Sequence, residues 1–459
     1  MSTMDKELLS RIVKTWGLAK VYYVGGCVRD MMLGKEPGDY DLVVDCKDGA
    51  NIFTDYLREN WSDVCSGFTV FPVYGTAKFD LLGEKIECVM PRTETYREGP
   101  RKPDHVSYAG GIEEDAYRRD FCCNALYQDV VSGVVLDPTK RGLDDLKNRI
   151  LRTPIPGEQT FRDDPLRMLR AFRFAYRLGF TIAPETLECI TDYTEYYKLS
   201  MERVWSEFSK ILVCDNPSQA IRDLHNHNLL TYIIPVLDAS WGMNQHSKYH
   251  NLDLTEHTLK VLENTRPDLT LRTAALLHDL AKYNNHETRE DGSWSYIGHE
   301  KESARLSKEI LERLRCPGKF IEDVGVIIEN HMTLKQNPEN ITRKRVRKMM
   351  RTLGDNLGLT LELIDADNLA HHPDYIIRGQ REKVLEIVEE EKNKPQPLKS
   401  PVSGRAIMLR LGIQEGIEVG KIKEKMQEWY DENPELTEDE LFKKYEDEHK
   451  YGRFNEDNL

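Results

Sequence analysis

The sequence predicts two structural classes in one chain: an α/β part with a mixed sheet up to about residue 150, then an all-α remainder. Short β-prone apolar runs alternate with helical segments before residue 150. From Pro165 onward, long segments with apolar residues at helical spacing dominate. The 459 residues are enough for several domains.

In the first part, apolar periodicity predicts helices over 5–16 and 50–59. Strands are expected over 21–24, 40–44, 69–74, 76–81, 84–90 and 125–130. In the second part, helices are expected over 165–178, 202–213, 217–227, 254–265, 269–283, 300–314, 319–332, 342–353, 358–370 and 378–392. A Pro- and Lys-rich stretch at 392–401 predicts a linker, and a small helical tail covers 404–430 and 437–448.

Composition indicates a globular protein without a membrane partner. Hydrophobic residues make up 39% and charged residues 31%, and no apolar run approaches the roughly 20 residues of a membrane span. The first residues resemble neither a signal peptide nor a transit peptide, so we expect a cytoplasmic protein. The nine cysteines form no CxxC pair, which argues against a zinc ribbon or a disulfide framework.

Charge is unevenly distributed along the chain. The net charge is -14, yet residues 140–180 are mainly basic and the run Arg343–Arg351 carries six basic residues. Local basic patches can bind a polyanion through its phosphates even when the whole molecule is acidic. We therefore expect the neck and tail surfaces, including Arg343–Arg351, to contact RNA.

Two glycines follow the first predicted strand and carry the first functional signal. Gly25 and Gly26 permit a close backbone approach to a ligand and leave amides free, and Arg29 follows on the next turn. A guanidinium beside free amides suits a triphosphate. A Gly-Gly pair alone is usually only a turn.

A pair of carboxylates follows on the next predicted strand. Asp39 and Asp41 are two residues apart and point to the same face of a strand. Side-by-side carboxylates suit Mg²⁺, which prefers oxygen ligands. Glu87, on a neighbouring predicted strand, would complete a two-metal phosphoryl-transfer site.

These motifs resemble those of a known family. Residues 25–30 followed by Asp39 and Asp41 resemble the head motif of the class II tRNA nucleotidyltransferases, which are the CCA-adding enzymes and bacterial poly(A) polymerases of the polymerase-β-like superfamily. Four later segments resemble, in order, the family's nucleotide-binding block, its hinge, its nucleotide-selection motif and its last neck motif: 118–126, 137–146, 163–167 and 202–207. The similarity spans roughly residues 20–240.

The resemblance implies a polymerase-β-like head and a role for each motif residue. Asp39 and Asp41 would hold two Mg²⁺ ions, with Glu87 assisting. Gly25, Gly26 and Arg29 would bind the triphosphate, Asp120 and Asn124 the sugar. The block that supplies these two residues also contains Arg119 as a nucleotide-binding candidate.

Asp164 and Arg167 are the candidates for reading the base. Three residues apart at a helix start, they share one face. A carboxylate accepts from the amino group of C or A while a guanidinium donates to the adjacent ring acceptor, so one pair accepts both bases and rejects U and G. The family pattern has Glu where this chain has Asp163, which would support the motif; Arg170 continues along the helix and would hold triphosphate or RNA backbone.

Residues 94–111 form a Gly-, Pro- and charge-rich stretch between Glu94 and Gly111. It matches the place of the flexible loop that complete CCA-adding enzymes need for the final A. Its presence favours complete CCA addition over a CC-only enzyme.

A second histidine-rich pattern lies between residues 250 and 370. His257, the dipeptide His278-Asp279 and Asp367 occur in the order of the HD metal-dependent phosphohydrolase superfamily, and His299 and His331 lie between them. An HD dipeptide inside an apolar helix is costly to bury without a partner, which favours a divalent metal site. The resemblance leaves open whether the HD domain hydrolyses RNA ends or serves as a helical body.

The sequence thus predicts a nucleotidyltransferase head (1–150), a helical neck (151–240), an HD helical domain (241–390) and a small helical tail (391–459). The expected function is template-independent addition of CCA to tRNA from CTP and ATP, with release of pyrophosphate; we expect no DNA and no membrane partner. A poly(A) polymerase of the same family, an HD phosphohydrolase acting on RNA ends and a non-catalytic RNA-binding protein are the alternatives. The acidic C-terminal tail weighs against the poly(A) polymerase, and the intact Asp39 and Asp41 pair against a pure binding protein.

Overall fold

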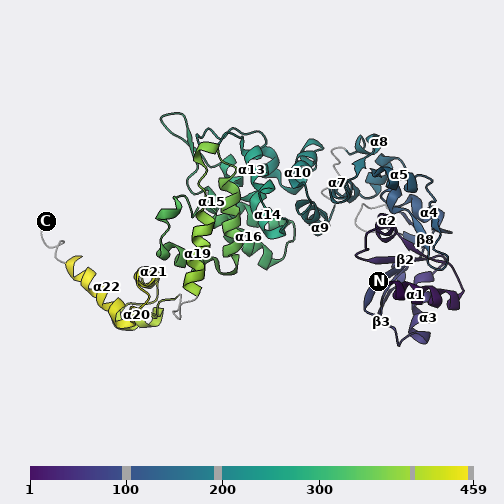
Figure 1. The fold of residues 1–459 in the computed structure, drawn as a ribbon, viewed down its shortest axis with the longest axis horizontal. Helices are drawn as coiled ribbons and strands as arrows, with labels where there is room; N and C mark the ends of the chain where they lie inside the picture. The colour runs from purple at the N-terminus through teal and green to yellow at the C-terminus, as the bar shows by residue number, and fades with distance from the viewer. Residues whose placement is uncertain (96–104, 191–198, 393–398, 453–459) are drawn as a thin grey trace. The chain divides into compact units, whose positions relative to one another are not determined.

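A computed structural model describes residues 1–95, 105–190, 199–392 and 399–452. The chain divides into two compact units, Met1–Asp238 and Ala239–Leu459. The first contains a mixed sheet and the second is mostly helical, which confirms the predicted fold class (Figure 1). Within the described residues, none of the helices combines the length and apolar character needed to cross a lipid bilayer.

The first unit is organised around a seven-stranded sheet with the order β3-β4-β5-β2-β1-β8-β9. The strands are β1 (Val21–Val24), β2 (Tyr40–Val44), β3 (Cys65–Phe71), β4 (Thr76–Leu81), β5 (Glu84–Val89), β8 (Tyr127–Asp129) and β9 (Val135–Leu136). β2 and β5 are parallel, and every other neighbouring pair is antiparallel. The hairpin β6 (Arg92–Thr95) and β7 (His105–Tyr108) forms a separate two-stranded sheet.

Helices cover both faces of this sheet. α1 (Thr3–Trp16) begins with a capping box between Ser2 and Asp5, and its Trp16 packs on Phe53 of α3 (Gly49–Asn60) at 4.9 Å between ring centroids. α3 contacts β2, β3, β4 and β5, whereas Ile112 of α4 (Ile112–Tyr117) packs with Tyr127 in a cluster on the other face. Alternation along the strands therefore buries both faces.

α2 (Gly26–Met32) packs beside β1 and β2, and the remaining helices of the first unit follow the sheet in the sequence. They are α5 (Gly142–Asn148), α6 (Gly157–Asp163), α7 (Leu166–Leu178), α8 (Pro184–Leu187), α9 (Met201–Leu212), α10 (Pro217–Asn226), α11 (Leu230–Ile233) and α12 (Pro235–Ala239). α7 packs on α9 and α10, and Phe172 and Phe208 are buried among them. A two-stranded sheet of β10 (Ile150–Leu151) and β11 (Thr181–Ile182) lies in the same unit.

The second unit is a set of packed helices. They are α13 (Leu254–Glu263), α14 (Leu269–Leu277), α15 (His299–Arg313), α16 (Gly318–Asn330), α17 (Arg343–Leu353), α18 (Leu357–Asn368), α19 (Gln380–Lys392), α20 (Gly404–Leu411), α21 (Ile417–Glu432) and α22 (Glu438–Gly452). A hairpin of β12 (Glu287–Thr288) and β13 (Trp294–Ser295) precedes α15. α14 contacts α13, α16 and α18, so segments far apart in sequence meet around it (Figure 1).

Several predicted boundaries are wrong for local reasons. The strand expected over 69–74 is β3 and ends at Phe71, because Pro72 starts a 3₁₀ turn. The helix expected over 269–283 ends at Leu277, and a 3₁₀ helix over Leu280–Tyr283 follows the HD dipeptide. In the tail, Gly412 adopts a left-handed conformation (φ 66°) and ends α20, so 404–430 is two helices. The sequence did not predict the short strands β6, β7, β9 and β10, nor β11 to β13 within the helical region.

Candidate functional site

The turn between β1 and α2 brings a guanidinium directly over the glycines. Gly25 has φ 74°, and a Cβ there would lie 3.3 Å from Nη1 of Arg119. The left-handed backbone conformation therefore favours glycine, and a larger side chain would also have to displace the guanidinium slightly. Arg29 is buried behind this turn and donates from Nη1 to Oδ1 of Asn124 at 2.8 Å.

Three acidic residues lie together beside this turn. In the parallel pairing of β2 with β5, Asp41 is directly opposite Glu87, and Asp39 immediately precedes β2. Burial, followed by the charge of Glu87, raises the pKa of Asp41 to about 6. Lys78 of β4 forms an ion pair with Glu87 at 2.8 Å. Asp39, Asp41 and Glu87 together thus carry more negative charge than Lys78 neutralises.

A buried aspartate that the sequence analysis did not single out anchors the two arginines of the nucleotide-binding block. Asp115 of α4 has no exposed surface, and it accepts from Nη2 of Arg118 at 2.7 Å and from Nη2 of Arg119 at 2.8 Å. The hydroxyl of Tyr127 donates to the same carboxylate at 2.6 Å. Although burial opposes ionisation, these partners hold the pKa of Asp115 below its usual value. The sequence contains one signal for this contact. Asp115 precedes Arg118 by three residues and Arg119 by four, the spacing at which side chains meet on one face of a helix.

The proposed base-reading residues have separate protein partners. Arg167 donates from Nη2 to the backbone oxygen of Arg118 at 2.6 Å and from Nη1 to that of Thr160 at 3.3 Å. Asp164 lies between α6 and α7, where it accepts from Nη2 of Arg203 on α9 at 2.8 Å. The structure therefore positions both side chains from different elements rather than pairing them with each other.

The predicted sugar-binding residues belong to a second network. Asp120 accepts from Nε and Nη2 of Arg170 at 2.9 and 2.7 Å, and from Nδ2 of Asn124 at 3.1 Å. Burial alone would raise the pKa of Asp120, but Arg170 and Asn124 hold it at about 2. Glu207 of α9 contacts the other side of Arg170 at 3.4 Å. Asp163, at the end of α6, is half-buried, and burial raises its pKa.

In the second unit, the four predicted HD residues converge from three helical segments. His257 of α13 has Nε2 3.0 Å from Oδ1 of Asp367, which lies on α18, and 3.5 Å from Oδ2 of Asp279. His278 has Nε2 3.1 Å from the same Oδ2 and 3.7 Å from Oδ1 of Asp367. All four residues are buried.

His299 of α15 and His331 lie on the other side of Asp279. Their Nε2 atoms are 3.2 and 3.8 Å from its Oδ1 atom. Among the described residues, Nε2 of His257, His278 and His299 and both carboxylate oxygens of Asp279 are buried and lie at ion-pair distances from charged or imidazole groups, but none of these contacts has the geometry of a hydrogen bond. Buried unpaired polar atoms are costly unless a ligand satisfies them. Two overlapping groups have the spacing to hold a metal ion: His257, His278 and Asp367, and His278, Asp279 and His331.

The basic run Arg343–Arg351 has acidic partners within its own unit. Arg347 pairs with Glu391 of α19 at 2.7 Å and is buried, and Arg351 pairs with Asp431 of α21 at 2.8 Å. Arg343 also pairs with Glu391, at 3.1 Å. These charges hold α17 against α19 and α21, so Arg347 and Arg351 already have acidic protein partners, and contact of the run with RNA stays a prediction.

The proposed loop for the final A lies mainly outside the described residues, which exclude 96–104. The strands that flank it, β6 and β7, pair in an antiparallel register from Arg92 opposite Tyr108 to Thr95 opposite His105. Asp115 accepts from the backbone N–H of Arg92 at 3.2 Å, which links this hairpin to the arginine network.

Three family models match consecutive parts of the chain. They are described as the poly A polymerase head domain (residues 21–152), the probable RNA and SrmB-binding site of polymerase A (179–240) and the HD domain (240–443). The Bacillus stearothermophilus CCA-adding enzyme, solved in complex with CTP, has a similar fold, with a TM-score of 0.69, 22% identity, and coverage of 98% of this chain and 100% of that one. A Thermotoga maritima CCA-adding enzyme complexed with tRNA gives a TM-score of 0.58 at 20% identity, covering 95% of this chain and 93% of that one.

Curated relatives are more similar in sequence. The multifunctional CCA protein of Pseudomonas fluorescens strain SBW25 is 38% identical over 330 residues, which are 68% of this chain and 75% of that protein. The multifunctional CCA protein of Xylella fastidiosa strain M23 is 33% identical over 336 residues, covering 69% and 74%. The family predicted from the five ordered motifs is thereby confirmed: this chain belongs to the multifunctional CCA proteins, the tRNA nucleotidyltransferase family with a poly A polymerase head and an HD domain.

Proposed function

We propose that this chain adds C, C and A to the 3′ end of tRNA, using CTP and ATP and releasing pyrophosphate. The observation that carries the proposal is the position of Arg118 and Arg119 between the two halves of the site. Arg119 lies over Gly25 and acts electrostatically on Asp41, whereas the backbone of Arg118 accepts from Arg167. One dipeptide thus couples the acidic row of the head to the base-reading residue of the neck.

In the proposed reaction, the nucleotide is held by fixed donors. The Gly25–Gly26 turn, Arg29 and Arg119 bind the triphosphate, since backbone amides and guanidinium groups both donate to phosphate oxygens. Asp120 and Asn124 position the ribose, and Arg170 keeps Asp120 ionised as an acceptor. The 3′-hydroxyl of the tRNA attacks the α-phosphorus as the bond to pyrophosphate breaks.

Base choice is assigned to the start of α7. Asp164 accepts from the amino group that C and A share, and Arg167 donates to the ring acceptor beside it. Arg203 orients Asp164, and Asp163 supports the turn between α6 and α7. Rejection of U and G follows because each would leave a buried donor or acceptor unpaired.

The acidic row fits the metal that this family requires. Asp39, Asp41 and Glu87 offer only carboxylate oxygens, the ligands that Mg²⁺ prefers, and the pKa of Asp41 is raised first by burial and then by the neighbouring charge of Glu87. These carboxylates would hold two Mg²⁺ ions, which would supply activation of the attacking hydroxyl and stabilisation of the leaving pyrophosphate. We place the reaction in the cytoplasm, and assign it to a head (1–150) and neck (151–240) followed by an HD domain (241–390) and tail (391–459).

Incorporation into a tRNA transcript lacking CCA tests the proposal. With Mg²⁺, CTP and ATP, the wild type should add three nucleotides and stop. Asp41→Asn should abolish addition, and Arg167→Ala should admit UTP and GTP; Asp63→Asn, an exposed acid of the same sheet region, is the control. Long A tails on any RNA would establish the poly(A) polymerase instead, and addition of C-C alone would refute complete CCA synthesis.

We propose a second activity at the HD centre, the metal-dependent hydrolysis of phosphate esters at RNA ends. The convergence of buried imidazole and carboxylate groups with the spacing of metal ligands supports it, because such groups suit a divalent cation. Metal content of the purified protein and hydrolysis of a 2′,3′-cyclic phosphate test it. His257→Ala should lower both, whereas Asp41→Asn should leave the hydrolysis unchanged; a metal-loaded protein without hydrolysis would limit the centre to a structural role.

A further inference from the structure

Two cavities in the second unit meet at the HD centre. One has a volume of about 730 Å³ and the other about 510 Å³, both within the range of about 300–1,000 Å³ that is common for small-molecule sites. Their linings share five residues: Tyr249, His250, Lys282, Met332 and Lys335. We call them the tyrosine cavity, which Tyr375 also lines, and the tryptophan cavity, which Trp294 also lines.

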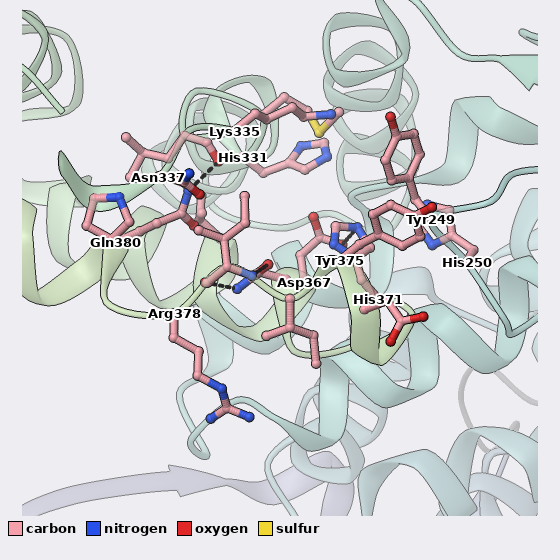
Figure 2. A pocket seen from close by; sticks show the side chains of 18 of the residues that line it. Tyr249, His250, His331, Lys335, Asn337, Asp367, His371, Tyr375, Arg378 and Gln380 are labelled. Carbon is pink, nitrogen blue, oxygen red and sulfur yellow. Dashed lines mark hydrogen bonds and ion pairs between the residues drawn. The ribbon is translucent and has the colours of Figure 1, made fainter. Parts of the chain in front are cut away.

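The metal-ligating cluster opens into both cavities. His331 and Asp367 line the tyrosine cavity, whereas His299 lines the tryptophan cavity. Figure 2 shows His331 and Asp367 in the wall of the tyrosine cavity, with Tyr249 and His250 on one side. Asp279, between these histidines, directs Oδ2 toward His278 and Oδ1 toward His299. A reacting group at the cluster is therefore reachable from two directions.

The residues at the junction suit a phosphate. Lys282 is buried with Nζ 2.6 Å from Oδ2 of Asp279, and Lys335 is exposed. Both lysines line both cavities. Two ammonium groups beside a candidate metal centre provide charge for an anion that spans the junction.

Each cavity also contains aromatic surface. In the tyrosine cavity, the rings of Tyr249 and Tyr375 meet edge to face at 4.9 Å and are 44% and 37% exposed. In the tryptophan cavity, Trp294 stacks on His286 at 3.8 Å and stands near Tyr296. Aromatic side chains along a cationic groove are the usual means of binding the bases of single-stranded nucleic acid.

A substrate with a terminal or cyclic phosphate needs space for one nucleoside only. The two cavities offer space for one nucleoside on each side of the HD centre. We propose that the HD centre hydrolyses a linear phosphodiester of single-stranded RNA, with one nucleoside in each cavity and the scissile phosphate at the junction between Lys282 and Lys335. Water adds to phosphorus, the bond to one ribose oxygen breaks, and the water proton passes to that oxygen. The products are a phosphomonoester and a free hydroxyl. The inference rests on the proposed phosphohydrolase activity and specifies its substrate.

The test compares a diester with a monoester-type substrate in the full-length, metal-loaded protein. The dinucleotide ApA and a short oligo(A) should be hydrolysed with a kcat/KM at least tenfold above that for p-nitrophenyl phosphate. Tyr375→Leu and Trp294→Leu, one in each cavity, should each raise the KM for ApA about tenfold, since each removes a stacking surface. Tyr74→Leu, an equally exposed tyrosine of the head (37%), is the matched control.

A binding measurement separates recognition from metal loading. Calorimetric titration of the metal-free protein with ApA should show the same weakening in both variants, and their thermal unfolding should match the wild type. Hydrolysis of a 2′,3′-cyclic phosphate without hydrolysis of ApA would overturn the inference and leave the proposed end-processing activity intact. Loss of ApA affinity in only one variant would also overturn it, and failure to hydrolyse any ester would remove both proposals.

Discussion

Replacing Asp115 with asparagine tests whether this residue positions the two arginines of the proposed nucleotide site. Asp115→Asn keeps the size of the side chain but removes the charge that two guanidinium groups share at 2.7 and 2.8 Å. Because the carboxylate has no exposed surface, the change leaves cationic partners in a poorly solvated region. Removing one partner of a buried ion pair costs about 3–5 kcal/mol. For a unit of the size of Met1–Asp238, that corresponds to a loss of about 6–20 °C in Tm.

The same substitution should also weaken nucleotide binding. Asp115 positions Arg119, which lies over the Gly25 turn, so its loss should raise the KM for CTP and ATP together, by tenfold or more. Steady-state incorporation at 25 °C, with the folded fraction checked by thermal unfolding, measures this. Glu114→Gln, an exposed acid in the same helix, should change neither quantity. A variant that melts early but retains wild-type KM values would refute the positioning role and leave Asp115 as a structural residue.

Three further predictions address other parts of the molecule. Because the pKa of Asp41 is raised to about 6, a proton competes with the cation, so Mg²⁺ affinity at the head should fall several-fold between pH 7.5 and 5.5 by calorimetric titration; a flat profile would contradict this assignment. Arg203→Ala frees Asp164 from its partner at 2.8 Å and should increase misincorporation of UTP and GTP at an unchanged Tm, as measured with single-nucleotide reactions; retained base choice would show that Asp164 needs no such support. Arg351→Met removes the ion pair with Asp431 and should speed proteolytic release of the tail, while incorporation of CTP stays at the wild-type rate; equal cleavage rates would argue against this anchor.

Local patterns in the sequence were sufficient to predict the strands and the turn that carry the motifs of the head. The apolar runs at 21–24 and 40–44 are strands as predicted, and the Gly25–Gly26 pair falls at the turn where a strand gives way to a helix. Glu87 was expected on a neighbouring strand, and the β2–β5 register brings it beside Asp41. That register depends on the pairing of strands that are distant in the sequence, and no local pattern reports it. The sequence therefore predicted that Glu87 lies on a strand near Asp41, but not that the two residues are directly opposite each other.

The supporting residues were harder to predict because their partners are distant or backbone groups. Arg203 bonds to Asp164 across 39 positions, and Arg167 finds a carbonyl 49 positions away. No periodicity or spacing reports such contacts, which form only when α7 packs against α9 and the head. His299 and His331 were visible as histidines, but their place opposite His278 across Asp279 follows from the packing of α15 and α16 against α14.

The basic run of α17 shows that a high density of basic residues in a sequence does not by itself identify a surface available to RNA. A guanidinium whose charge is matched by one acid of the same chain is less available to a phosphate, and Arg347 pairs with Glu391 while Arg351 pairs with Asp431. The two acids lie on α19 and α21, far from α17 in the sequence, so each ion pair neutralises one basic and one acidic side chain. Around Arg119 the balance of charges is different. One carboxylate, that of Asp115, accepts from two arginines and a tyrosine, so this network keeps a net positive charge beside the acidic row. We therefore expect the ratio of acids to bases within a buried network, rather than the density of bases along the chain, to decide where this protein can hold a phosphate.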